Sequence, residues 1–313
     1  MVADSFEGPE KKLEIAVTPG APSLRSLGHA FWREVVAAAS AQVLSQIANE
    51  DCDAYLLSES SLFVWDERLT LITCGRTRIV SAAEHIFTRV SPADVALLVL
   101  ERKNEHFPRR QPTSFREDAR QLAERLPGVA LRFGREHTHS VRLFHSAREY
   151  TPEPGDTTLE VLMHGICEET SQAFSTGDLA EARATGVTEV LEGFQVDDFV
   201  FEPAGYSLNA LRGRDYFTFH VTPERVGSYV SFETNADLGG DPEPLVRRVV
   251  EIFRPESFDV LSFAPAGCEV QEPSVEGYRL RQRVEAGVCG YAVSFLHWYR
   301  PPREPTGPSE ISL

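Results

Sequence analysis

Two halves of this chain repeat one order of strand-like runs, and this repetition limits the folds that the chain can adopt. Residues 149–156 are rich in proline and glycine and are typical of a linker. After this linker the pattern begins again, and the sequence at 158–161 is similar to that at 12–15. We therefore interpret residues 1–150 and 151–300 as two αβ halves that arose by internal duplication.

Each half is expected to supply one antiparallel sheet with helices on one face. Short apolar runs predict the strands, and residues 24–47 carry apolar side chains at helical spacing, which predicts one long helix. Two sheets packed face to face bury both apolar faces and leave the helices outside. The sequence therefore predicts an α+β fold, a four-layer αββα sandwich of two antiparallel sheets. The proline-rich residues 301–313 are expected to form a disordered tail.

The net charge narrows the classes of partner. The chain has 313 residues and a formal net charge of −16, which repels the phosphates of nucleic acids and of anionic membranes. This charge is compatible with a cationic ligand, although it can also serve only to keep a protein in solution. No segment reaches the ~18 consecutive apolar residues of a membrane-spanning helix. We expect neither a nucleic acid nor a membrane as a partner.

The cysteines and the N-terminus favour a cytoplasmic location. The five cysteines form no CxxC pair and no metal-binding spacing, so the sequence predicts no metal site. An odd number of widely spaced cysteines is typical of proteins with reduced thiols in the cytosol. The first dozen residues include several charged side chains, where a secretory signal requires an apolar core.

One apolar run is interrupted in a way that turn chemistry does not explain. The sequence Ser-Glu-Ser-Ser at 58–61 separates two strand-like segments and contains neither glycine nor proline. A serine on a strained backbone can attack the carbonyl of the preceding residue. Elimination from the resulting ester leaves a pyruvoyl group at a new N-terminus. From the residue types alone, a solvent-exposed pair of serines is the simpler interpretation.

This run and four other segments resemble one known family, in the order that the family has them. Residues 57–64 are similar to the processing site of the eukaryotic-type S-adenosylmethionine decarboxylase proenzymes. The resemblance extends from Phe6 to about Trp298, and the αββα sandwich is also the fold that the resemblance implies. The other matching segments are FEGPEKKLE at 6–14, TCG at 73–75, GYSLN at 205–209, and HVTPE at 220–224 together with SYVSFETN at 228–235.

The resemblance implies a self-cleaving enzyme. Cleavage between Glu59 and Ser60 would convert Ser60 into a covalent pyruvoyl cofactor, which serves as an electron sink. Cys74 would protonate the product carbon, and the pair of Ser207 and His220 would act in self-processing. Taken alone, Cys74 would be interpreted as a small buried hydrophobe and His220 as a hydrogen-bonded core histidine. The catalytic residues that the resemblance implies are Ser60, Cys74, Glu10, Glu7, Ser207 and His220.

The resemblance also implies a substrate site. Phe6 and Phe201 match the aromatic residues that enclose the adenine, and stacking suits a sulfonium ligand. Glu224 matches the acid that binds the ribose hydroxyls, and the backbone at Leu57 and Glu59 would contact the adenine edge. Ordinary core packing remains the alternative for the two phenylalanines.

A third set of residues resembles the putrescine-binding pocket of the animal members. The chain departs from the family here, because the family's lysine is replaced by Ile72 while Lys12 supplies a charge where animal enzymes have an apolar residue. Plant members carry a basic residue at this place and need no putrescine. We therefore predict weak stimulation by putrescine or none. The pocket residues are Asp156, Thr158, Glu160, Glu233, Phe263 and Lys12.

The sequence thus predicts a pyruvoyl-dependent S-adenosylmethionine decarboxylase that makes the aminopropyl donor for spermidine and spermine synthesis. Its two cleaved chains would stay associated, as a monomer or a homodimer. Three alternatives remain. The scaffold could decarboxylate another amino acid, such as ornithine or arginine, or it could be a catalytically inactive regulatory paralogue. Without the resemblance, the chain would be interpreted as a ligand-binding protein without chemistry.

Overall fold

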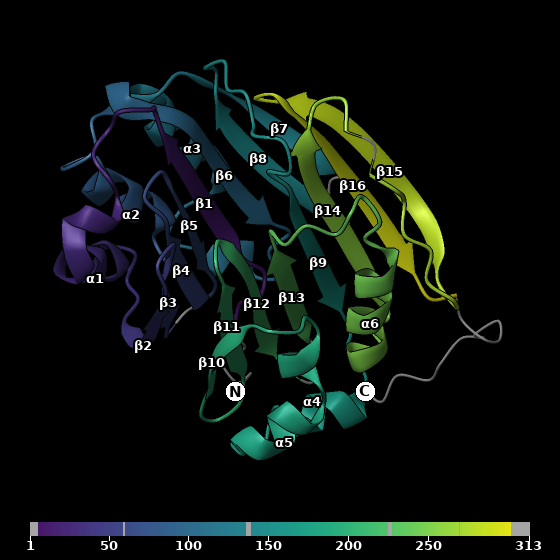
Figure 1. Ribbon diagram of the computed structural model, residues 1–313. Coiled ribbons are helices and arrows are strands. Elements are labelled where there is room, and N and C mark those ends of the chain that lie inside the picture. The colour runs from purple at the N-terminus through teal and green to yellow at the C-terminus, as the bar shows by residue number, and fades with distance from the viewer. Residues whose placement is uncertain (1–5, 59, 136–138, 225–226, 269, 302–313) are drawn as a thin grey trace.

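Two eight-stranded antiparallel sheets form the frame of the molecule (Figure 1), a computed structural model. The structure describes residues 6–58, 60–135, 139–224, 227–268 and 270–301. The first sheet has the order β2-β3-β4-β5-β1-β6-β8-β7. Its strands are β1 (Lys11–Val17), β2 (Val43–Ala48), β3 (Asp53–Leu57), β4 (Ser60–Val64), β5 (Arg68–Thr73), β6 (Val95–Lys103), β7 (Gly128–Gly134) and β8 (Ser140–Ser146).

The second sheet repeats this order with the strands of the second half of the chain. It runs β10-β11-β12-β13-β9-β14-β16-β15, so each strand has a counterpart at the same place in the first sheet. The equal order fits the interpretation of a duplication. The strands are β9 (Thr158–His164), β10 (Gln195–Val200), β11 (Tyr206–Arg212), β12 (Asp215–Thr222), β13 (Tyr229–Thr234), β14 (Ser257–Pro265), β15 (Arg279–Val288) and β16 (Tyr291–Tyr299).

The helices cover the outer faces of the two sheets (Figure 1), which confirms the predicted αββα sandwich. One apolar cluster joins α1 and α2 to the first sheet, and a second joins α6 to the second sheet. Both clusters bury apolar side chains from alternate strand positions. The helices are α1 (Gly28–Ala38), α2 (Ile79–Ile86), α3 (Phe115–Arg125), α4 (Glu168–Ala173), α5 (Leu179–Ala184) and α6 (Glu243–Phe253), and short 3-10 turns lie at Arg25–Leu27, Pro92–Asp94, Pro108–Arg110 and Val187–Glu189.

The prediction of one long helix at 24–47 is wrong at its C-terminal part. Only α1 is α-helical, and residues 43–48 form the edge strand β2, paired with β3. A residue with positive φ, Ser40, lies between helix and strand. Helical spacing of apolar residues persists across this break, so the spacing alone could not locate it.

The space between the sheets is partly apolar and partly ionic. Apolar side chains fill one part, among them Leu97 and Leu143 of the first sheet and Phe295 of the second. Polar and charged side chains fill the other part, because strands β1, β6, β9, β12 and β13 carry them at every second position.

In the described ranges no helix is long and apolar enough to cross a membrane. The predicted tail falls almost entirely on residues 302–313, outside the described ranges.

Candidate active site

Ser60 occupies a strained position at the first residue of β4. Its φ is +124°, a conformation that L side chains rarely adopt, and the side chain is buried. Its backbone pairs with Thr73 of β5 and with Leu57 of β3. The Ser60 hydroxyl lies 3.3 Å from the Cys74 sulfur. The two residues expected to carry the chemistry are thus in contact, while Glu59, the other side of the predicted cleavage point, lies outside the described residues.

Ser207 and His220 face each other on neighbouring strands of the second sheet, where the register of β11 and β12 pairs them directly. The Ser207 hydroxyl is 3.0 Å from His220 Nδ1. The other ring nitrogen, Nε2, is 3.2 Å from the hydroxyl of Ser61 on the first sheet. Burial lowers the pKa of His220 to about 3, so its imidazole is neutral near neutral pH.

Three side chains that the sequence analysis did not single out complete this inter-sheet contact. Ser61 donates a hydrogen bond to Asn209 Oδ1 at 2.5 Å, and Thr218 lies 3.0 Å from His220 Nε2. His220 therefore contacts Ser61, the residue next to Ser60. The alternation of polar side chains along β11 and β12 was a signal that could have identified Asn209 and Thr218.

Glu10 is a buried carboxyl group between the sheets. The Ser231 hydroxyl, on β13, donates to its Oε1 at 2.6 Å. Burial raises its pKa to about 8, although the Ser231 hydrogen bond and Lys103 lower it in part. Glu10 therefore holds a proton near neutral pH and has the properties of a general acid.

Glu7 makes mainly backbone contacts. Its carboxylate accepts hydrogen bonds from the backbone N–H groups of His106 at 2.6 Å and Phe107 at 2.7 Å. Its own carbonyl accepts from the N–H of Gly75, the residue after Cys74, at 2.8 Å. This arrangement joins the segment after β6 to the turn after β5, so the geometry gives Glu7 a positioning role around Cys74.

Two of the residues expected to bind the nucleoside, Phe6 and Glu224, are in contact. Glu224 Oε1 accepts a hydrogen bond from the backbone N–H of Phe6 at 2.5 Å, which brings together the positions expected for ribose and adenine. Phe6 is 39% exposed, a large exposure for an aromatic side chain. Phe201 follows β10, and its ring centroid lies 4.9 Å from that of Phe199.

Behind the catalytic residues lies a buried cluster of charges, here called the inter-sheet charge cluster. Lys12 Nζ is 3.0 Å from Glu160, 3.1 Å from Glu233 and 3.8 Å from Glu101. Lys103 contacts Glu160 and lies 2.6 Å from Glu101. Burial opposes the charge of Lys12, but Glu160 and Glu233 keep its pKa well above the usual value. The members of the cluster are Lys12, Glu101, Lys103, Glu160 and Glu233.

Position 72 lies directly beside Lys12, because the register of β1 and β5 pairs Lys12 with Ile72. The positive charge of Lys12 thus lies one strand away from position 72, where the resemblance led us to expect a lysine. The Lys12 ammonium is 5.8 Å from the centroid of the Phe263 ring, and Phe263 pairs with Thr158. The structure thus brings together five of the predicted pocket residues, namely Lys12, Glu160, Glu233, Phe263 and Thr158.

Asp156, the sixth pocket residue, is paired with another cation. Arg68 Nη1 lies 2.6 Å from Asp156 Oδ1, and the same guanidinium contacts Glu14. The Tyr291 hydroxyl donates to Asp156 Oδ2 at 2.6 Å. Sequence reasoning missed Arg68, since a charged residue at the first position of a strand is usual at a surface.

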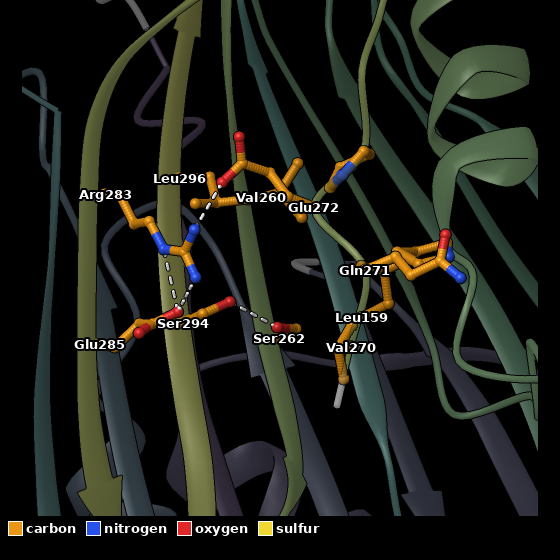
Figure 2. Close-up of a pocket in the computed structure, with 12 residues that line it drawn as sticks. Leu159, Val260, Ser262, Val270, Gln271, Glu272, Arg283, Glu285, Ser294 and Leu296 are labelled. Carbon is orange, nitrogen blue, oxygen red and sulfur yellow. Dashed lines mark hydrogen bonds and ion pairs between the residues drawn. The ribbon is translucent and has the colours of Figure 1, made fainter. Parts of the chain in front are cut away.

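Two cavities of the structure differ greatly in size. The cavity in Figure 2, between the 270–273 segment and the outer face of the second sheet, has a volume of only about 20 Å³, room for about one water molecule. Its Arg283 is paired with Glu272 and Glu285. A much larger cleft of about 980 Å³ is lined by Arg68, Asp156 and Tyr150. Of the six residues of the putrescine-like pocket, Asp156 lines this cleft.

Comparisons with known proteins agree with this geometry. A family model described as adenosylmethionine decarboxylase matches residues 3–299. The chain is 32% identical to the S-adenosylmethionine decarboxylase proenzyme of Dictyostelium discoideum over 92% of its length and 84% of that protein. It is 34% identical to the proenzyme of Leishmania donovani, over 87% and 77% of the two chains. The crystal structure of a Trypanosoma brucei AdoMetDC-delta26 monomer, 24% identical, has the same fold with a TM-score of 0.62 and covers 77% of this chain and 99% of that one.

Proposed function

The chain belongs to the adenosylmethionine decarboxylase family, and we propose that it is a self-processing decarboxylase of S-adenosylmethionine. The observation that carries this proposal is Ser60, a buried serine with a φ of +124° in contact with Cys74. Breaking the peptide bond before Ser60 would relieve this backbone strain, and this relief supports attack of the Ser60 hydroxyl on the preceding carbonyl. The expected cleavage lies between Glu59 and Ser60.

Self-processing needs a base and a group that stabilises the intermediate. His220 is neutral and buried, and its two nitrogens contact hydroxyls on both sheets, those of Ser207 and Ser61. We assign to His220 the removal of the proton that drives ester elimination, and to Ser207 the hydrogen bond that holds the intermediate. Ser61 links this pair to the backbone at Ser60.

The cofactor of this proposal is a pyruvoyl group made from Ser60, which supplies a carbonyl that binds the substrate amine and an electron sink for decarboxylation. The residues around Ser60 fit this group. Cys74 lies within 3.3 Å of the Ser60 hydroxyl, where its thiol can deliver a proton to the product carbon. Glu10, with a pKa near 8, provides a second protonated group between the sheets.

The substrate assignment rests on the exposed Phe6 and its contact with Glu224. An aromatic face for adenine and a carboxylate for the ribose hydroxyls suit a nucleoside sulfonium. Neither group suits ornithine or arginine, which carry no base or sugar. The presence of Ser60, Cys74 and His220 also disfavours an inactive paralogue. The product would be the aminopropyl donor for spermidine and spermine synthesis.

We further propose that putrescine is not needed for activity. Lys12 is already paired with Glu160 and Glu233, and Arg68 is already paired with Asp156. A diamine would have to compete with two resident cations for the same carboxylates. A cytoplasmic location, and the choice between monomer and homodimer, stay predictions from the sequence.

Intact-mass analysis of the purified protein tests the processing step. We expect two chains, a short one that ends at Glu59 and a long one that begins with a pyruvoyl group at position 60. The Ser60→Ala variant should stay one chain. The release of carbon dioxide from S-adenosylmethionine tests the substrate. A single chain that lacks decarboxylase activity after long incubation contradicts the proposal, and turnover of ornithine or arginine alone contradicts the substrate assignment.

A further inference from the structure

A second group of titratable side chains lies between the sheets, and none of its members is among the catalytic residues named above. The carboxylate of Asp259 on β14 lies 2.7 Å from His297 Nδ1 on β16 and 3.2 Å from His139 Nδ1. His164 on β9 places its Nε2 3.4 Å from the same carboxylate. Asp259 and His297 are buried, and His139 is partly exposed. Three imidazoles therefore surround one carboxylate.

The strand registers explain why these side chains meet. Asp259 and His297 are directly paired across β14 and β16, so both side chains point to the same face of the second sheet. Leu162, on β9, pairs with Asp259, and His164 lies two residues further on the same face. His139 precedes β8 of the first sheet and approaches from the opposite side. The group therefore bridges the two sheets.

The ligand atoms of this group are close enough to hold one metal ion. One nitrogen each of His139 and His297 and one oxygen of Asp259 lie within 4.8 Å of one another. Tetrahedral zinc with bonds of about 2.0–2.2 Å places its ligand atoms roughly 3.3–3.5 Å apart. Side-chain rotations that move each atom by on the order of 1 Å would close the set. Two imidazoles and a carboxylate are ligands typical of zinc.

His164 provides an independent observation that points to a ligand. Its Nε2 is buried and makes no hydrogen bond among the residues that the structure describes, although it lies within ion-pair distance of Asp259. A buried polar atom without a hydrogen bond is uncommon and calls for a partner. The ring also packs edge-on against His139, with centroids 4.3 Å apart, so His164 faces the same point as the other ligands.

We propose that His139, Asp259 and His297 bind one Zn²⁺ ion, with His164 as the fourth ligand. The ion would take the place of the protons that now join the imidazoles to the carboxylate. It would join the loop before β8 in the first sheet to three strands of the second. Its role would be structural, because His164, Asp259 and His297 lie on β9, β14 and β16 and His139 lies before β8, whereas Ser207 and His220 lie on β11 and β12. No local pattern in the sequence indicates this site, because its four residues are far apart in the chain.

Metal titration of the whole, processed protein tests the proposal. After removal of metal with a chelator, we expect uptake of one Zn²⁺ per chain and, with Co²⁺ as a probe, the intense visible bands of a tetrahedral site. The variants His297→Ala and His139→Ala should each weaken Zn²⁺ binding by a hundredfold or more, estimated from the ~10–100-fold cost of losing even an outer contact. His85→Ala, which changes a partly exposed histidine on α2, is the matched control and should bind as before.

The thermal stability of the same proteins gives a second measurement. Zn²⁺ should raise the Tm of the unmodified protein and of His85→Ala, and should leave the Tm of His139→Ala unchanged, because a ligand that binds only the folded state stabilises it. His139 lies in a partly exposed loop, so this variant is expected to fold. The proposal is overturned if the folded protein takes up no Zn²⁺, or if His139→Ala and His297→Ala bind it as tightly as the unmodified protein.

Discussion

The Lys12→Met variant should be less stable, and should acquire a response to putrescine. The Lys12 ammonium is buried and lies 3.0 Å from Glu160 and 3.1 Å from Glu233. Removal of one partner from a buried ion pair costs about 3–5 kcal/mol. Proton uptake limits this cost, because burial already raises the pKa of Glu233 to about 7. We therefore expect a loss of about 3 kcal/mol near neutral pH, which lowers Tm by roughly 6–12 °C.

The pH dependence of this deficit follows from the same carboxylates. Burial raises the pKa of Glu233 to about 7 even beside Lys12, so without Lys12 its pKa in the folded state lies further above that in the unfolded state, and the folded variant loses stability as pH rises. The difference in Tm between the variant and the unmodified protein should thus be small near pH 5 and large near pH 8. Arg125→Met, which breaks the exposed pair with Glu84, is the control and should leave Tm nearly unchanged.

Putrescine at millimolar concentration should raise the Tm and the decarboxylase rate of Lys12→Met, because a diamine can take the place of the missing ammonium. It should change neither property in the unmodified protein. The reasoning is refuted if Lys12→Met has the same Tm as the unmodified protein across this pH range. It is also refuted if putrescine stimulates the unmodified enzyme several-fold.

Three further predictions concern the catalytic residues. Ser60→Ala should abolish chain cleavage, whereas Cys74→Ala should cleave and lose most of its decarboxylase activity; the opposite pattern by mass spectrometry and carbon dioxide release would contradict the assignments. Since the pKa of His220 is near 3, the processing rate should show no inflection from this histidine between about pH 5 and 8, and His220→Ala should process slowly or not at all. The pKa of Glu10 is raised from 4.5 to about 8, so its contribution to stability is present below its unfolded pKa and is lost as pH rises toward 8. This loss amounts to on the order of a few kcal/mol. The Glu10→Gln variant should lack this decline of Tm with rising pH.

Much of the fold was predictable because strand periodicity is a local property. The run around Ser60 and the strand that bears His220 both show strand periodicity. The repetition between the two halves of the chain predicted two sheets. The long helix at 24–47 was wrong because the same apolar spacing continues into β2, which pairs with β3 and is therefore decided by a tertiary contact.

The candidate site was predictable where a motif carried it, as for Ser60 and Cys74. The residues that contact these motif residues from other strands were not predictable. Ser61, Arg68 and Ser231 gain their roles from partners on other strands, and nothing near them in sequence indicates those partners. The His-Asp group shows the same limit, because His139 and Asp259 meet only when the two sheets pack.

The place of β1 in the first sheet determines how the two fragments behave after cleavage. The short fragment, residues 1–59, would hold β1, β2 and β3, and β1 lies between β5 and β6 of the long fragment. The short fragment can leave only if both ladders of β1 separate, so the fragments should not dissociate on dilution. Cleavage would nevertheless change the molecularity of unfolding, because the processed protein would unfold into two separate chains. The uncut chain refolds as one molecule, whereas the two fragments must meet again in solution, so refolding of the processed protein should slow as its concentration falls.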